Sequence, residues 1–245
     1  MGKGKLKKFQ ENKSFSCLIQ PATEDLLGLD HPLKGHWKEQ VFRNGNPIVL
    51  ELGCGKGEYT VALAERFPEK NYIGIDIKGA RLWKGAKYAT QQALGNVAFI
   101  RARVEFIESL FAPEEIDEIW ITFADPQERK PRKRLTHPRF LERYRNILVP
   151  GGIIHLKTDS RLLHHFTLET ARQNGLTVLR QGEDIYGSGM ADDLLSIQTF
   201  YEKNFRAQGI PITYLAFRLD KDGPLAEPEW DQQPYEQTYK TLTRS

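Results

Sequence analysis

Short apolar runs alternate with stretches of helical periodicity through the middle of the 245-residue chain. Apolar runs of four to eight residues are typical of buried strands, and apolar residues three or four apart are typical of amphipathic helices. Stop signals such as Pro68 and Pro150-Gly-Gly152 separate the two patterns. The runs predict strands at residues 48–52, 72–76, 97–100, 118–123, 153–159, 177–181 and 212–219. The periodic stretches predict helices that end at Pro68 and others over about 78–94, 137–149, 160–174 and 198–207.

This alternation predicts a doubly wound, mostly parallel α/β sheet, because parallel neighbours need helical crossovers. In such a sheet ligands bind outside the carboxyl ends of the strands. Four acids fall at those ends: Glu51, Asp76, Asp125 and Asp159. The sequence therefore predicts a site built around these carboxylates.

The chain divides into three predicted segments. Residues 1–45 lack sustained periodicity and contain Pro21 and Pro32, so we expect a basic, partly mobile N-terminal arm. The folded domain is expected over residues 46–219. Residues 220–245 contain several Pro and Gln residues and are expected to form an appended tail.

Composition narrows the class of protein. An apolar fraction of 40% with 27% charged residues is ordinary for a soluble globular chain. No run is long enough for a membrane span, and the N-terminus lacks the apolar core of a signal peptide. Cys17 and Cys54 fit neither a disulfide framework nor a metal cluster, and the six histidines lack metal-ligand spacing. We expect a cytoplasmic protein without a membrane segment or a metal ion.

Basic residues gather in two blocks, although the net charge is only +3. Residues 1–13 hold five lysines and one acid, and eight cations lie between Arg129 and Arg145. Two such blocks in a nearly balanced chain favour a polyanionic partner. The alternative is a solvated tail and a charged surface helix.

A glycine-rich turn, Gly53-Cys-Gly55-Lys-Gly57, follows the first predicted strand. Its spacing differs from the Gly-x-Gly-x-x-Gly of dinucleotide sites, and it lacks the Gly-Lys-Ser/Thr of phosphate loops. Asp76 lies 25 residues after Glu51, near the spacing at which an acid binds a ribose diol. Because two carboxylates would repel a diphosphate, the pair favours a cationic nucleoside, S-adenosylmethionine, over a nicotinamide cofactor.

The apolar run from Ile119 to Phe123 ends at Asp125-Pro126, and five cations follow between Arg129 and Arg134. A strand that delivers an acid to a basic loop indicates a reactive site beside a polyanion groove. The alternative for Asp125 and Asp159 is a helix N-cap, a common position for Asp.

The chain resembles the class I S-adenosylmethionine-dependent methyltransferases through Glu51-x-Gly-x-Gly and Asp76, and more narrowly the bacterial tRNA (guanine-N7)-methyltransferases. The narrower resemblance runs from about Ile48 to Leu219. It rests on Phe123-Ala-Asp-Pro126 with its basic loop, Arg134-Leu-Thr136, Gly151-Gly152 with His155-Leu-Lys-Thr-Asp159, and Thr199-Phe-Tyr-Glu202. It implies a Rossmann-like fold, and transfer of a methyl group to guanine N7 at position 46 in the variable loop of tRNA.

The resemblance also implies roles for single residues. The cofactor is expected among Glu51, Gly53, Gly55, Asp76, Arg103 and Asp125, with Asp125 catalytic. The tRNA and its guanine are expected at Arg129, Asp159, Thr199, Phe200, Tyr201 and Glu202. Without the resemblance, the last four would be the start of an amphipathic helix with Phe200 and Tyr201 packed inside.

Two positions depart from the family pattern. Gln127 stands where the family usually has Trp, in a loop about two residues shorter. Arg103 stands where an acid or Asn-like residue usually lies near the adenine, so either Arg103 contributes its backbone or Glu105 supplies the side chain.

Other functions remain open at this point. One is a methyltransferase acting on a small molecule or a protein, and another is a non-enzymatic RNA-binding protein on a degenerate methyltransferase fold. The glycine spacing disfavours a nicotinamide oxidoreductase. The sequence leaves open whether the protein is a monomer or a homodimer.

Overall fold

The computed structural model describes residues 3–235, which divide into two units. The first contains residues up to 119 together with 146–149, and the second contains 120–145 and the residues from 150 onward. Residues 1–2 of the predicted arm and 236–245 of the predicted tail lie outside the described residues.

The strands of the first unit lie in the order β1-β4-β3-β2-β5, and the pairs β1–β4, β4–β3 and β3–β2 are parallel. Every residue of β2, β3 and β4 is buried, as expected for parallel strands that are covered on both faces. Leu50 of β2 lies opposite Ile73 of β3. The strands are β1 (Leu18–Ile19), β2 (Ile48–Leu52), β3 (Asn71–Ile75), β4 (Val97–Ile100) and the beginning of β5 (Ile116–Thr122).

Crossover helices connect these strands, with α2 between β2 and β3 and α3 between β3 and β4. The buried positions of α2 include Val61 and Ala64, which lie three residues apart as the sequence pattern requires. The helices of the first unit are α1 (Lys3–Glu11), α2 (Glu58–Arg66), α3 (Gly79–Gln91) and α4 (Ile107–Leu110). Its shorter helical turns are η1 (Asn12–Ser14), η2 (Glu24–Leu26), η3 (Trp37–Phe42) and η4 (Val104–Phe106).

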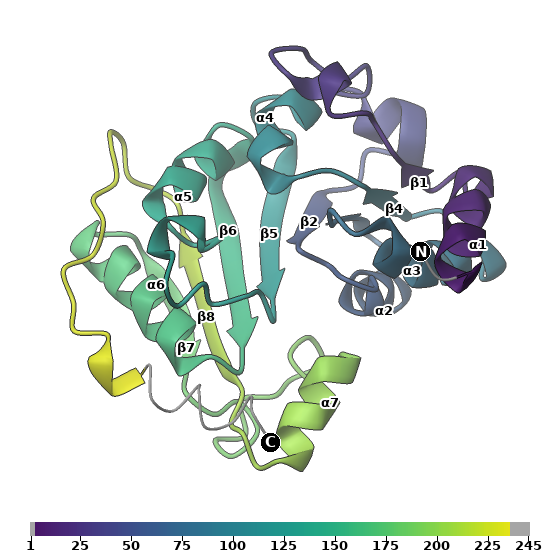
Figure 1. The fold of residues 1–245 in the computed structure, drawn as a ribbon. Helices are drawn as coiled ribbons and strands as arrows, with labels where there is room; N and C mark the ends of the chain where they lie inside the picture. The colour runs from purple at the N-terminus through teal and green to yellow at the C-terminus, as the bar shows by residue number, and fades with distance from the viewer. Residues whose placement is uncertain (1–2, 236–245) are drawn as a thin grey trace. The chain divides into compact units, whose positions relative to one another are not determined.

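The N-terminal segment is more structured than the expected arm of short turns. Helix α1 packs beside α3 (Figure 1). Trp83 Nε1 donates to Glu11 Oε2 at 2.6 Å, and the buried Asn12 donates from Nδ2 to the Gly79 carbonyl at 2.8 Å. In the sequence, a lysine-rich helix of nine residues has too few apolar positions to show a period. The domain boundaries at 45/46 and 219/220 remain predictions.

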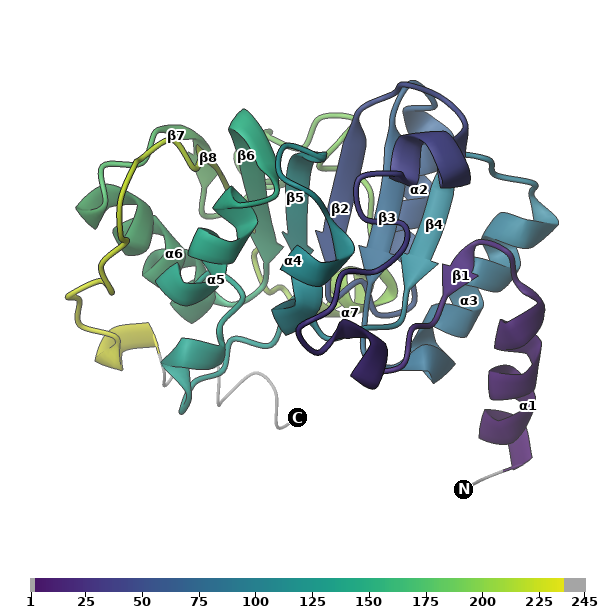
Figure 2. The same cartoon turned by 90° about the horizontal axis from the view of Figure 1, so that it is seen from above.

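The second unit contains the end of β5 and the order β5-β6-β8-β7, in which β8 is antiparallel to both of its neighbours. Helices α5 and α6 lie on the same side of these strands (Figure 2). The strands are β6 (Leu148–Thr158), β7 (Val178–Gly182) and β8 (Thr213–Arg218). The helical segments are η5 (Pro131–Lys133), α5 (Pro138–Arg145), α6 (Arg161–Gln173) and α7 (Phe200–Ala207).

The predicted doubly wound, mostly parallel α/β fold is confirmed. Strands predicted at 48–52 and 97–100 match β2 and β4 residue for residue. The helix predicted to run to residue 149 is wrong at its end, because α5 ends at Arg145 and β6 already begins at Leu148. Within residues 3–235, no helix is long and apolar enough to cross a membrane.

Candidate active site

The glycine loop carries the chain from β2 into α2 in a conformation that favours glycine. Gly53, Gly55 and Gly57 have φ of 72°, 59° and 69°, all in the left-handed region. The backbone N–H groups of Gly53 and Cys54 donate to the Ile75 carbonyl at 2.8 and 3.0 Å, which holds the loop against the end of β3.

Helix α3 lies so close to this loop that a glycine is also needed on the helix surface, at position 85. A Cβ atom at Gly85 would lie 2.8 Å from the Lys56 carbonyl oxygen and 3.2 Å from Gly57 Cα. Such distances are shorter than van der Waals contact, so any larger residue at position 85 would push α3 away from the loop.

Glu51 lies under the glycine loop and is 2% exposed. One of its oxygens, Oε2, accepts from the Thr60 backbone N–H at 2.9 Å and also from the Thr60 hydroxyl. A carboxylate is favourable near the N-terminus of a helix, because the first N–H groups carry partial positive charge. Glu51 therefore anchors the start of α2.

Asp76, just after β3, holds the other side of the glycine loop by hydrogen bonds. Its Oδ2 accepts from the Gly55 N–H at 3.0 Å, and its Oδ1 accepts from the Lys78 N–H at 2.7 Å. Burial raises the pKa of the Cys54 thiol well above its ordinary value, and the nearby charges of Glu51 and Asp76 raise this pKa further. The structure thus brings Glu51, Gly53, Cys54, Gly55 and Asp76 into one group, which we call the glycine-loop cluster.

Arg103 lies just after β4, where it directly precedes η4. Its side chain is exposed, and its Nη2 atom lies 3.4 Å from Glu105 Oε1. The two residues that were predicted as alternatives for the adenine side are therefore paired with each other.

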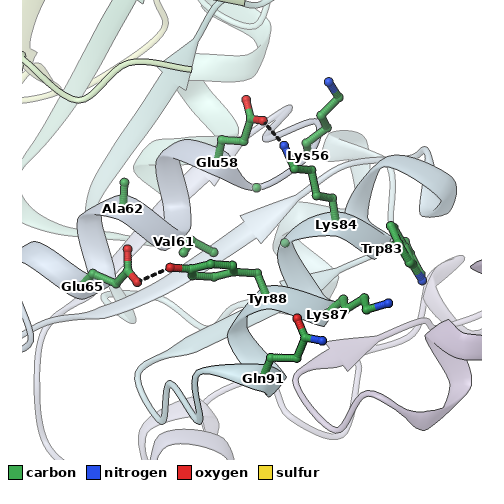
Figure 3. A pocket seen from close by; sticks show the side chains of 12 residues that line it. Lys56, Glu58, Val61, Ala62, Glu65, Trp83, Lys84, Lys87, Tyr88 and Gln91 are labelled. Atoms are coloured by element: carbon green, nitrogen blue, oxygen red, sulfur yellow. Dashed lines mark hydrogen bonds and ion pairs between the residues drawn. The ribbon is translucent and has the colours of Figure 1, made fainter. Parts of the chain in front are cut away.

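A separate pocket of about 410 Å³ lies between α2 and α3 (Figure 3). Two contacts lie among its lining residues, from Lys84 Nζ to Glu58 Oε1 at 2.7 Å and from the Tyr88 hydroxyl to Glu65 Oε1 at 2.7 Å. None of the three acids predicted to bind the cofactor, Glu51, Asp76 and Asp125, lines this pocket. It is therefore not the predicted cofactor site.

In the second unit, Asp125 is exposed on the turn that follows β5. Its Oδ1 accepts from the Gln127 N–H at 2.9 Å. Phe123 and Gln127, two residues to either side, both have φ of 49°, which is strained for residues with a side chain. Such strain persists only where the surroundings enforce it, and it is concentrated at functional sites.

The cations of the basic loop after Asp125 differ in their exposure to solvent. Arg129 is exposed, like Lys130, Arg132 and Lys133. Arg134 is fully buried, and its Nε donates to the Pro126 carbonyl at 2.9 Å. The loop thus presents four cations to solvent and keeps the fifth inside.

Asp159 is half-buried at the end of β6. Burial raises the pKa of its carboxyl group to about 6. The N-cap alternative is wrong for this residue, because the cap of α6 is Ser160, whose Oγ accepts from the Leu163 N–H at 3.2 Å.

The four residues from Thr199 to Glu202 have the opposite burial to that expected for an amphipathic helix start. Phe200 and Tyr201 are 49% and 44% exposed, whereas Glu202 is fully buried and Thr199 caps α7 by accepting from the Glu202 N–H at 3.2 Å. The alternative in which the two aromatic residues pack inside is therefore wrong.

Glu202 is buried against a residue that sequence reasoning missed. Lys157 of β6 is also fully buried, and its Nζ lies 2.7 Å from Glu202 Oε1 and 2.9 Å from Glu202 Oε2. Tyr186 donates from its hydroxyl to Glu202 Oε1 at 2.7 Å. The sequence feature that could have revealed this residue is a lysine within the apolar strand Ile153-Ile-His-Leu-Lys157.

Comparisons with known proteins show which proteins the chain is similar to. A family model described as "Putative methyltransferase" matches residues 45–215. The chain is 51% identical to a tRNA (guanine-N(7)-)-methyltransferase of Christiangramia forsetii, over 89% of this chain and 98% of that protein. It is 46% identical to a protein of the same name from Bacteroides thetaiotaomicron, over 100% of this chain and 98% of that protein.

Among solved structures, the chain is similar to the 16S rRNA methyltransferase KamB, with a TM-score of 0.57 and 15% identity. The match covers 74% of this chain and 91% of that one. At this level of identity the likeness shows a shared methyltransferase fold.

Proposed function

The chain belongs to the tRNA (guanine-N(7)-)-methyltransferase family, and we propose that it transfers a methyl group from S-adenosylmethionine to N7 of a guanine in tRNA. The observation that carries this proposal is the similarity to relatives of that name over nearly the whole length of both chains. Position 46 of the variable loop is the proposed target, and the cytoplasm is the proposed location.

We assign the cofactor to the glycine-loop cluster, with Arg103 at its adenine side. Asp76 is held by two backbone N–H groups, yet a carboxylate has about four lone-pair sites and can still accept from ribose hydroxyls. The negative charges of Glu51 and Asp76 favour a cationic ligand over a diphosphate. When bound, the cofactor supplies its sulfonium methyl group to the guanine.

Guanine N7 has an in-plane lone pair, so no residue needs to remove a proton before transfer. The protein mainly has to align the reactants, which can contribute up to roughly 7–11 kcal/mol. In this proposal Asp125 binds the donor edge of the guanine or the amino group of the cofactor. Its carboxylate also favours the positive charge that develops on the methylated purine.

The second unit supplies the proposed tRNA contacts. Arg129, exposed in the basic loop, would contact the RNA backbone, and Asp159 would accept from the guanine. Phe200 and Tyr201 offer exposed aromatic surfaces for stacking on bases. Thr199 and Glu202 were expected to contact the guanine edge, but both are buried, so in this proposal they hold the start of α7 and thereby position Phe200 and Tyr201.

The test uses labelled S-adenosylmethionine and bulk tRNA, followed by chemical cleavage at N7-methylguanosine. We expect transfer by the wild-type protein and a loss of about 10²-fold or more in Asp125→Ala, with an unchanged melting temperature. Asp125→Asn serves as the matched variant that keeps the shape and removes the charge. Wild-type protein that binds tRNA without transferring a methyl group would instead support the non-catalytic RNA-binding alternative.

A further inference from the structure

The described part of the C-terminal tail lies beside the end of α6 (Figure 1), where two side-chain amides bind the tail backbone. Asn174 donates from Nδ2 to the Ala226 carbonyl at 2.9 Å, and its Oδ1 accepts from the Ala226 N–H at 2.8 Å. Gln173 donates to the Glu227 carbonyl at 3.2 Å and accepts from the Glu229 N–H at 2.8 Å. Two neighbouring side-chain amides thus hold the tail as a strand partner would.

Aromatic side chains fasten the end of the described tail. The Tyr235 ring stacks on His165 with centroids 4.2 Å apart, and Trp230 lies 6.1 Å from Phe166 and 5.6 Å from Tyr235. Aromatic pairs at these separations contribute attraction beyond their buried area. Helix α6 therefore holds the tail by both polar and aromatic contacts.

The tail also reaches the buried arginine of the basic loop. The Arg134 guanidinium lies 4.4 Å from the Phe166 ring, and its Nη2 lies 3.5 Å from Gln232 Oε1. On its other side Arg134 donates from Nε to the carbonyl of Pro126, the residue directly after Asp125. A chain of contacts therefore runs from the tail through Arg134 to the turn that carries Asp125.

Glu227 of the tail fastens the same loop on both sides of Arg134. Its Oε1 lies 3.2 Å from Arg132 Nε and 3.2 Å from His137 Nε2. The loop segment from residue 132 to residue 137 is thereby held against the tail.

This anchoring explains how the strained turn is maintained. Phe123 and Gln127 keep positive φ angles, and a strained backbone needs contacts that enforce it. A guanidinium suits this position because its planar fork can donate to a carbonyl while its face lies on an aromatic ring. A lysine ammonium on the same stem cannot make both contacts.

We propose that Arg134 is a positioning residue for methyl transfer, held in place by the tail through Gln232 and the aromatic contacts of Trp230. It fixes the Pro126 carbonyl and thereby the orientation of Asp125. The proposal rests on the proposed function, because Asp125 is the group that it orients. It also assigns a task to residues 220–235.

The test compares Arg134→Lys, Gln232→Ala and Trp230→Ala in the full-length chain. We expect kcat for methyl transfer to tRNA to fall between about ten- and a hundredfold in Arg134→Lys, because small displacements of aligned groups have effects of this size. Gln232→Ala and Trp230→Ala should lower kcat less. The Kd for S-adenosylmethionine should change much less than kcat, because the glycine-loop cluster is untouched. Glu229→Gln, which changes an exposed side chain of the same tail, is the control and should retain wild-type kcat.

Two results would overturn the proposal. One is unchanged kcat in both Arg134→Lys and Gln232→Ala. The other is a parallel loss of kcat, cofactor affinity and melting temperature in all three variants, which would indicate a structural role alone. If the wild-type protein itself transfers no methyl group, the proposed function fails first and this proposal falls with it.

Discussion

At the scale of single residues, His164 shows how burial couples protonation to folding. This side chain is 1% exposed on α6, and burial lowers its pKa to about 4, helped by His165, Arg161 and Arg172. The unfolded chain binds the proton near pH 6.5 and the folded chain only near pH 4, so stability is lost as the pH falls through this window. The loss should approach about 2 kcal/mol at pH 5 and about 3 kcal/mol near pH 4.

Replacing this histidine should therefore flatten the acid limb of the stability curve. Between pH 7.5 and 5, His164→Leu should lose about 2 kcal/mol less free energy of unfolding than the wild type, measured by urea titration. Asp159 acts in the opposite sense, since its raised pKa adds stability as the pH falls from about 6 towards its ordinary value. Asp159 is present in the wild type and in His164→Leu, so its contribution cancels in the difference between their free energies of unfolding. Identical pH slopes for both proteins would rule out His164 as the group responsible.

At the scale of elements, the start of α7 is joined to β6 by a buried ion pair. Besides its contact with Glu202, Lys157 donates from Nζ to the carbonyls of Leu195 and Ile197 at 2.8 and 2.7 Å. Lys157→Met would leave the Glu202 carboxylate buried without its cation, which should lower the free energy of unfolding by about 3–5 kcal/mol. Chemical denaturation measures this loss.

The matched control is Lys203→Met, because Lys203 is an exposed lysine on the same helix. It should stay within about 0.5 kcal/mol of the wild type. Tyr186→Phe removes only one hydrogen bond to Glu202 and should cost about 1.5–3 kcal/mol. A Lys157→Met protein as stable as the Lys203→Met protein would contradict the proposed anchoring of α7.

The same elements show what the sequence can and cannot predict. β2 and β4 were predicted to the residue, because a strand buried on both faces is a continuous apolar run. Because such apolar runs also show where the strands end, the sequence was able to place Glu51 and Asp76 at the ends of their strands. The partner of Lys157 lies 45 residues further along the chain, so no local pattern could connect them. Burial of Glu202 with exposure of Phe200 and Tyr201 likewise depends on tertiary contacts that periodicity does not record.

At the scale of the whole molecule, the two basic blocks turn out to have different internal structure. The block after Asp125 contains one fully buried arginine, Arg134, which serves the loop itself. Within the N-terminal block, Lys3–Glu11 form α1, and Glu11 and Asn12 bind this segment to α3. Deleting residues 1–13 would therefore remove packing as well as charge, and substitutions are the cleaner test of RNA binding.

Lys5 and Lys7 are exposed on α1, so their replacement removes charge with little change in packing. If α1 contacts the tRNA backbone, the double variant Lys5→Gln/Lys7→Gln should bind tRNA more weakly. The slope of log K against log salt should become shallower by about one for each lost phosphate contact. The Kd for S-adenosylmethionine should not change, because the glycine-loop cluster keeps its contacts. Filter binding across a salt series measures the affinity for tRNA and the slope.

Lys38→Gln, outside both basic blocks, is the control for a general loss of positive charge. An equal change in slope for Lys38→Gln would mean that α1 contributes only to the overall field of the protein and makes no phosphate contact of its own.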